Sequence, residues 1–124
     1  MPLRMKLTAI TLDCSDPEAL AAFYRQATGL EVHPKSNSDF AGLNGDYGLL
    51  IGFQRVDDYR APCWPDQAVA QQLHLDFVVD DLDEAEALLL ELGAAKPEYQ
   101  PGGEGWRVLI DPAGHPFCLT KRAV

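Results

Sequence analysis

Two stretches decide the fold of this chain: LTAITLDCSDPEALAAFYRQATG at residues 7–29 and LHLDFVVDDLDEAEALLLELG at residues 73–93. Each stretch begins with an alternation of apolar and polar residues, continues through an Asp into an amphipathic run, and closes on a Gly. When Asp16 is aligned with Asp81, the apolar residues of the two alternating segments coincide. A repeat of this kind indicates two copies of one supersecondary unit. The chain is therefore predicted to consist of two matched modules.

The first copy predicts a strand over residues 7–14, because apolar and polar side chains alternate there. A helix should follow, capped by Ser15 or Asp16, with Pro17 in its first turn and Gly29 as its stop. The rest of the first module is expected to hold a short strand, a turn-rich segment and a further strand, at residues 31–34, 36–45 and 47–54.

The second copy predicts a strand over residues 74–79 and a helix that begins at Asp80 or Asp81 and ends at Gly93. A Gly- and Pro-rich loop follows, and then a hairpin of two strands around the turn Asp-Pro-Ala-Gly. The loop is expected at residues 97–105, the two strands at 106–110 and 117–120, and the turn between them at 111–114. Both halves therefore indicate the order βαβββ.

The predicted fold class is α+β, with two βαβββ modules that pair as half-barrels around one cleft. We expect a single domain over residues 1–124. Its first module spans about residues 5–57, a linker about 58–71, and the second module about 72–122.

Composition narrows the function classes. The 124 residues are 47% hydrophobic and 23% charged, which is typical of a globular domain. The net charge of −9 and the scattered Lys and Arg argue against a nucleic-acid partner. No apolar run reaches the length that a membrane helix requires, so no membrane partner is expected. The three widely spaced cysteines, an odd number, are expected to be reduced thiols in a cytoplasmic protein.

The order of the segments resembles the vicinal oxygen chelate superfamily, which includes glyoxalase I, bleomycin-resistance proteins and extradiol dioxygenases. Three segments carry the resemblance: ITLDCSDPEALAAFYRQATGLEV, QLHLDFVVDDLDEAEALLLELGA and WRVLIDPAGHPFCLT. The ending DPAGHPFCL is most similar to a bacterial glyoxalase-like subgroup. The resemblance implies two half-barrels around a cleft, and a homodimer is plausible.

Enzymes of the superfamily hold a divalent metal with four ligands in the cleft. The resemblance places these ligand positions at Ala9, within 49–53, at His74 and at Cys118, where the family usually has Glu. Alanine and the side chains of residues 49–53 cannot ligate a metal, so only His74 is retained. No cofactor is therefore predicted, and a divalent metal held by a new set that includes Asp13, Asp76 and Cys118 is the less favoured alternative.

Strand periodicity indicates which side chains line the cleft. Residues of one parity pack on the helices, so Asp13 in the first strand and His74 with Asp76 in the second should face the cleft. An imidazole supported by a carboxylate is a candidate general base or ligand contact. The alternative is a structural hydrogen bond inherited from a metal-binding ancestor. His74 and Asp76 are the candidate catalytic residues.

The remaining candidate ligand contacts are Phe53, Trp64, Trp106 and Cys118. Indole rings stack well on flat ligands, although packing in a core or a dimer interface explains them equally. A metal-free protein that binds a small, partly planar molecule is the favoured function, as in bleomycin-resistance members. The alternatives are a metal-dependent lyase or dioxygenase of the glyoxalase or extradiol type, and metal-free acid–base chemistry by His74 and Asp76.

Overall fold

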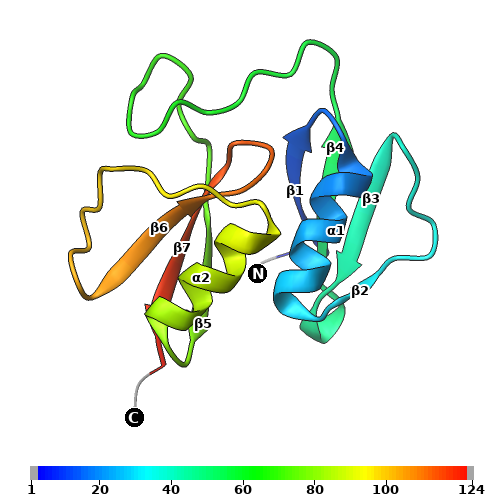
Figure 1. Ribbon diagram of the computed structural model, residues 1–124. Coiled ribbons are helices and arrows are strands. Elements are labelled where there is room, and N and C mark those ends of the chain that lie inside the picture. Colours follow the sequence, from blue (N-terminus) through cyan, green and yellow to red (C-terminus); the bar gives the residue numbers. More distant parts are fainter. Residues whose placement is uncertain (1–2, 123–124) are drawn as a thin grey trace. The chain divides into compact units, whose positions relative to one another are not determined.

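The computed structural model describes residues 3–122, and the chain divides into two compact units, Met1–Tyr59 and Arg60–Val124. Each unit contains one helix and one sheet of parallel and antiparallel strands (Figure 1). The α+β class predicted from the sequence is confirmed. Among the described residues, no helix is long and apolar enough to cross a membrane.

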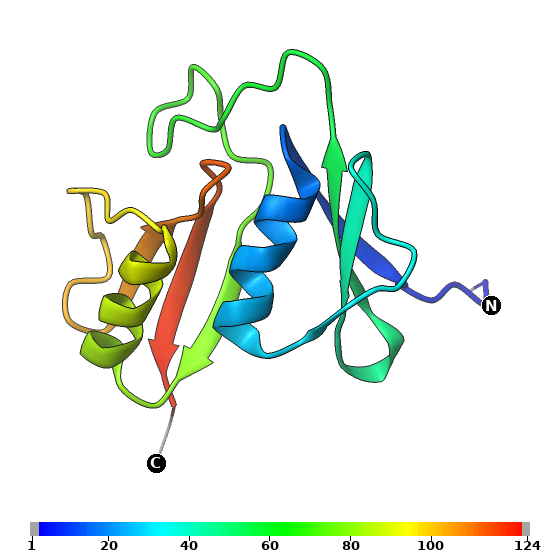
Figure 2. The same cartoon turned by 45° about the vertical axis from the view of Figure 1, so that its right-hand side comes forward.

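The first unit is a four-stranded sheet with one helix along one of its faces (Figure 1, Figure 2). Its strands follow the order β1-β4-β3-β2, in which β1 and β4 are parallel and the other pairs antiparallel. The elements are β1 Ala9–Cys14, α1 Pro17–Thr28, β2 Glu31–Val32, β3 Phe40–Asn44, the 3₁₀ turn η1 Asp46–Gly48, and β4 Leu50–Arg55.

Helix α1 begins and ends where the sequence predicts. The Asp16 side chain accepts a hydrogen bond from the backbone N–H of Ala19 at 3.1 Å, which caps the first turn. Gly29 ends the helix in the left-handed conformation, at φ 76°. Between these ends, Leu20, Phe23 and Tyr24 are buried. One helix face therefore covers the sheet, as the spacing of its apolar residues indicates.

Strand β3 lies within the segment that was predicted to be turn-rich. The turn signals belong to its flank, where the Asn37 side chain accepts hydrogen bonds from the backbone N–H groups of Asp39 and Phe40. The strand itself is closely packed, because a Cβ on Gly42 would lie 2.8 Å from Cδ1 of Leu50. The glycine and asparagine residues therefore indicated turns in a segment that contains a strand with buried central residues.

The second unit is a three-stranded sheet of order β5-β7-β6, with β5 parallel and β6 antiparallel to the central β7. Its elements are β5 Leu75–Val79, α2 Leu82–Leu92, β6 Trp106–Ile110 and β7 Pro116–Lys121. Asp81 caps α2 by accepting from the backbone N–H of Glu84 at 2.9 Å, and Gly93 ends it at φ 118°. The second copy of the repeat therefore has the same strand–helix opening as the first.

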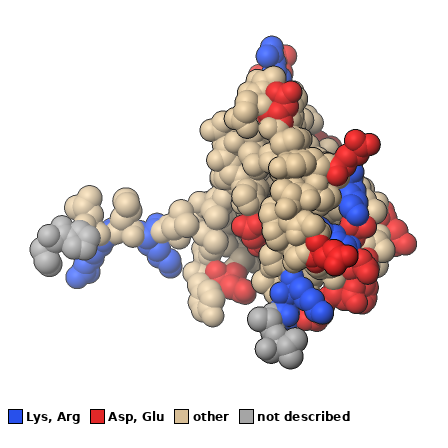
Figure 3. Space-filling model, turned by 90° about the vertical axis from the view of Figure 1, so that its left-hand side faces the viewer, with Lys and Arg blue, Asp and Glu red and all other residues tan. Residues whose placement is uncertain are grey.

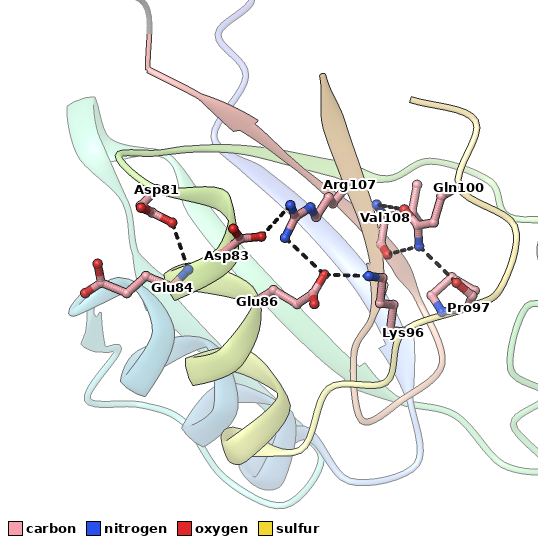
Figure 4. Close-up of polar contacts among 9 residues, drawn as sticks. All are labelled: Asp81, Asp83, Glu84, Glu86, Lys96, Pro97, Gln100, Arg107 and Val108. Atoms are coloured by element: carbon pink, nitrogen blue, oxygen red, sulfur yellow. Dashed lines mark hydrogen bonds and ion pairs between the residues drawn. The ribbon is translucent and has the colours of Figure 1, made fainter. Parts of the chain in front are cut away.

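The second unit differs from the predicted βαβββ order in one place. After α2 the described chain forms only an isolated bridge between Ala95 and Ile110 instead of a full strand. The segment after this bridge contains Pro97. There the side chain of Gln100 makes the hydrogen bonds that a paired strand would make through its backbone. This amide donates to the carbonyl oxygens of Pro97 and Val108 and accepts from the N–H of Val108 at 2.9 Å (Figure 4).

Charged side chains fasten α2 to β6. The Arg107 guanidinium lies 2.6 Å from the carboxylate of Asp83 and 3.4 Å from that of Glu86. Glu86 also pairs with Lys96 at 3.1 Å, so the helix, the strand and the connecting loop share one network (Figure 4). Arg107 is the half-buried member that belongs to β6. This network holds α2 against one face of the sheet. The opposite face is lined by other side chains.

Candidate functional site

The second unit contains a cavity of about 550 Å³, which we call the tryptophan pocket. Strands β5, β6 and β7 and the segment that precedes β5 provide its walls. The lining residues are Trp64, Gln71, His74, Asp76, Trp106, Val108, Pro116, Cys118 and Thr120. Five of them, Trp64, His74, Asp76, Trp106 and Cys118, are the candidates that the sequence places in this half of the chain.

Sheet register explains why these side chains meet. Asp76 lies beside Cys118 in the parallel β5–β7 pair, and Cys118 lies beside Val108 in the antiparallel β7–β6 pair. Neighbours in register point to the same face of a sheet. The alternate residues, such as Phe77 and Phe117, point to the opposite face, where their rings contact edge to face at 6.0 Å. The strand periodicity predicted for the second module is confirmed.

Three polar side chains gather on the sheet face of the tryptophan pocket. The Nε2 atom of His74 lies 3.3 Å from a carboxylate oxygen of Asp76. One potential ligand atom from each of His74, Asp76 and Cys118 falls within 4.8 Å of the others. His74 and Asp76 are exposed, whereas Cys118 is only 7% exposed. The trio therefore presents an accessible imidazole and carboxylate above a buried thiol.

Burial keeps the Cys118 thiol protonated. Desolvation, the negative charge of Asp76 and a hydrogen bond to Asp76 together raise the pKa of this thiol to about 11. A thiol with so high a pKa is a poor nucleophile at neutral pH, because the thiolate is the reactive form. Cys118 therefore acts as a neutral hydrogen-bonding group beside Asp76.

The metal site of the superfamily does not fit the residues present. In the first unit, Ala9 pairs in register with Leu50, and neither side chain has a ligand atom. In the second unit, the trio offers one imidazole, one carboxylate and one thiol. Hard divalent ions such as Mn²⁺ and Mg²⁺ prefer several oxygen ligands, and a soft thiol does not supply them. The donor set thus departs from the hard-ion chemistry of the family.

Each of the two indole rings packs against a neighbouring residue. The Trp64 ring packs against Tyr99, with ring centroids 5.5 Å apart and planes tilted by 37°. The Trp106 ring lies against Gly102, where a Cβ would come within 2.5 Å of Cγ of the indole. The Gly-rich loop before β6 therefore provides a flat backbone seat for Trp106. Both rings line the tryptophan pocket from segments outside the β5–β7 pair.

Two candidates belong to the first unit and have different environments. Phe53 is completely buried and stacks on Tyr24 of α1, with centroids 5.5 Å apart and planes within 4°. It lies beside Leu12 in register, on the helix-covered face, so the prediction that Phe53 contacts a ligand is wrong. Asp13 is exposed, on the opposite parity from the buried Leu12 and Cys14, as predicted. Its role as a ligand contact stays a prediction.

The tryptophan pocket also includes residues that the sequence did not indicate as candidates. Val108 and Thr120 follow from strand periodicity once the register of β6 on β7 is known. Gln71 lies outside any strand, and no pattern singles it out. Its Oε1 atom is buried without a hydrogen-bond partner among the described residues. A buried acceptor without a partner is unusual in a folded protein.

Residues 9–120 match the glyoxalase-like domain family. The chain therefore belongs to this family, within the vicinal oxygen chelate superfamily. No curated protein matches the sequence.

Solved structures share the fold. A glyoxalase/bleomycin resistance protein/dioxygenase family enzyme from Burkholderia phytofirmans PsJN is 21% identical, over 94% of this chain and 98% of its own, with a TM-score of 0.71. Lactoylglutathione lyase from Agrobacterium tumefaciens is 23% identical, over 98% and 96% of the two chains, with a TM-score of 0.62.

A third relative in structure is a fosfomycin resistance protein from Listeria monocytogenes, in complex with Mn(II) and dihydroxypropylphosphonic acid. It is 22% identical, over 95% of this chain and 90% of its own, with a TM-score of 0.68. At these identities the comparison establishes the fold, and the chemistry has to be argued from the side chains present.

Proposed function

We propose that this protein binds a small, partly planar molecule in the tryptophan pocket, without the divalent metal that enzymes of the superfamily use. Its role is recognition or sequestration of that molecule, as in bleomycin-resistance proteins. Affinity comes from apolar contact and stacking on the indoles, and the polar trio orients the ligand.

One observation carries the proposal. Two indoles and a polar trio from segments far apart in the sequence line a single cavity of about 550 Å³. Small-molecule sites typically have this size and combine apolar walls with a few polar groups. A core packing role explains neither the cavity nor the exposure of His74 and Asp76 within it. The convergence therefore supports a ligand site.

The contact between His74 and Asp76 supports a second candidate function, metal-free acid–base catalysis. A carboxylate 3.3 Å from the imidazole nitrogen can hold the ring in a fixed orientation. His74 would then accept a proton from a bound substrate at the nitrogen that does not face Asp76. The experiment below separates this function from simple binding.

The first experiment measures ligand binding by the fluorescence of the two tryptophans, using a library of flat small molecules. We expect saturable binding that weakens about tenfold or more in Trp106→Leu, because about 1–3 kcal/mol of stacking is lost. Trp64→Leu is the matched second variant. Unchanged affinity in both variants would refute binding in the tryptophan pocket.

The second experiment tests the chemistry on any ligand found. Conversion of the ligand by the wild type, lost in Asp76→Asn with binding retained, identifies acid–base catalysis. Binding without conversion supports sequestration. Elemental analysis of the purified protein decides on the metal: a stoichiometric divalent ion that is lost in His74→Ala contradicts the metal-free proposal and favours a lyase or dioxygenase with rearranged ligands.

We also propose that the protein forms a homodimer in a reducing, cytoplasmic compartment. No disulfide joins the described cysteines Cys14, Cys63 and Cys118, as such a compartment permits. Apolar Leu3 and Met5 near the N-terminus are 86% and 88% exposed, which an interface between subunits would explain. Light scattering after size-exclusion chromatography tests this: we expect a dimer that Met5→Asp weakens, and a monomeric wild type would contradict it.

A further inference from the structure

The walls of the tryptophan pocket carry an unbalanced set of charges. Asp76 is the only formally ionised acid among the lining residues, and none of them is Lys or Arg. An anion bound there would meet a carboxylate with no guanidinium or ammonium group to offset it. The chain as a whole has a net charge of −9, and several acidic side chains lie at the right and lower parts of the face in Figure 3, with some basic side chains among them. Both features favour a cationic ligand.

The polar atoms of the walls are mainly hydrogen-bond acceptors. Gln71 contributes an amide to these walls, and its buried Oε1 atom has no partner in the described part of the chain. Asp76 receives one contact from His74 and one from the Cys118 thiol. A carboxylate has about four acceptor positions, so Asp76 can still accept from a bound group. The ligand should therefore be rich in donors.

The indoles point to the same class of ligand. The face of an indole ring carries negative electrostatic potential, which attracts cations as well as flat rings. Trp64 and Trp106 both contribute to the walls. The Trp106 ring lies against Gly102, and the Trp64 ring packs on Tyr99. A flat cation is the ligand that benefits from both the rings and the carboxylate.

We infer that the tryptophan pocket selects planar cations with N–H groups, such as amidinium or protonated heteroaromatic amines, over anions of the same shape. This inference rests on the proposed function, because it specifies the ligand of the same site. It distinguishes this chain from a site for phosphonates or carboxylates, which needs positive groups that the pocket walls lack.

Three nearly isosteric probes test the inference: benzamidine, which is a cation, neutral benzamide and anionic benzoate. Binding to the full chain is followed by tryptophan fluorescence and NMR shifts at about pH 8, above the range in which an ordinary imidazole titrates. We expect benzamidine to bind at least about tenfold more tightly than benzoate, with benzamide between them. Added salt should reduce the difference between the charged probes.

Variants locate the selectivity. Asp76→Asn should weaken benzamidine about tenfold and leave benzamide nearly unchanged, since only the charge is removed. Glu91→Gln removes the same charge from an exposed position of α2 outside the pocket walls and should change neither probe.

The outcomes separate this inference from the proposed function. If benzoate binds as tightly as benzamidine or more tightly, the inference on ligand charge is overturned while the ligand site stands. If Glu91→Gln weakens benzamidine as much as Asp76→Asn, the overall charge of the protein and not the pocket selects the cation, which also overturns it. If none of the three probes binds, the proposed ligand site fails as well.

Discussion

At the scale of single residues, Cys118 shows how one position changes the chemistry available to a fold. The resemblance to the superfamily implies a glutamate ligand at this position, whereas this chain has a thiol beside the carboxylate of Asp76. Because the thiol is buried and its neighbour is negative, its proton is held firmly. A ligand position has become a neutral donor, and the negative charge of the site now rests on Asp76.

Alkylation rates test the state of Cys118. The pKa of about 11 predicts that iodoacetamide labels the exposed Cys63 well before Cys118 at neutral pH, with the sites read by mass spectrometry. Asp76→Asn removes the negative neighbour and should speed the labelling of Cys118 by about tenfold. Labelling of Cys118 as fast as Cys63 in the wild type contradicts the prediction.

The same thiol makes stability depend on alkaline pH. A raised folded-state pKa stabilises the protein below the ordinary pKa of 9.0, where the thiol is protonated in both states. As the pH rises from about 9 to about 11, the unfolded state loses its proton first, so this contribution to stability is lost. Urea unfolding of the wild type and Cys118→Ala should diverge in this window, with the variant losing less stability.

Phe53 carries a second prediction at this scale. It stacks on Tyr24 in the helix-covered layer of the first unit, so Phe53→Ala should cost about 3–5 kcal/mol of unfolding free energy. Denaturant melts measure this, and Phe53→Leu, which retains most of the volume, should cost clearly less. A loss below about 1 kcal/mol for the alanine variant would show that the site is poorly packed.

At the scale of secondary-structure elements, side chains form hydrogen bonds with backbone groups that have no backbone partner. The two N-caps, Asp16 and Asp81, perform one task at equivalent points of the repeat. In the second unit, Gln100 also replaces strand pairing at the outer edge of β6. Such polar substitutes were not predicted from the sequence, because a glutamine in a loop has no periodic pattern around it.

Gln100 therefore deserves a direct test. Gln100→Ala removes three hydrogen bonds to the backbone and should lower the unfolding free energy by about 1–3 kcal/mol. Gln100→Glu retains the acceptor for the N–H of Val108 but loses both donors, so it should not restore the loss. Faster amide exchange at Val108 in Gln100→Ala than in the wild type is the second measurement; equal exchange in these two proteins would argue against this role.

The seat of Trp106 gives the other prediction for an element. Gly102→Ala places a methyl group against the indole, which should force the ring to move at a cost of about 1–3 kcal/mol and weaken ligand binding. Gly105→Ala is the control, since its Cβ would meet only a backbone oxygen at 3.4 Å. Tryptophan emission and ligand affinity should change in the first variant alone.

At the scale of the whole molecule, the repeat predicted the family, the helices and most of the strands. Periodicity also placed His74 and Asp76 on one sheet face, because alternation along a strand is set by backbone geometry, whereas Cys118 was added by the resemblance to the superfamily. The prediction for Phe53 was wrong because the sheet face on which this residue lies depends on the register of β4 against β1, which the sequence does not specify. Gln71 was missed because loop conformation has no such rule.

Removal of metal is a test on the whole protein. The donor set predicts that EDTA leaves the melting temperature unchanged and that added Mn²⁺ does not raise it, because only a ligand that binds the folded state stabilises it. Thermal melts with and without each addition provide the measurement. A rise in melting temperature with Mn²⁺ that disappears in His74→Ala would show that the trio binds a hard ion after all.

The central position of β7 has a consequence for synthesis of the chain on the ribosome. The sheet of the first unit is complete once Arg55 has been made, so that unit can fold while translation continues. In the second unit, β5 and β6 pair only through β7, which ends at Lys121. They remain without their partner until Lys121 has been made, so the walls of the tryptophan pocket form later than the sheet of the first unit.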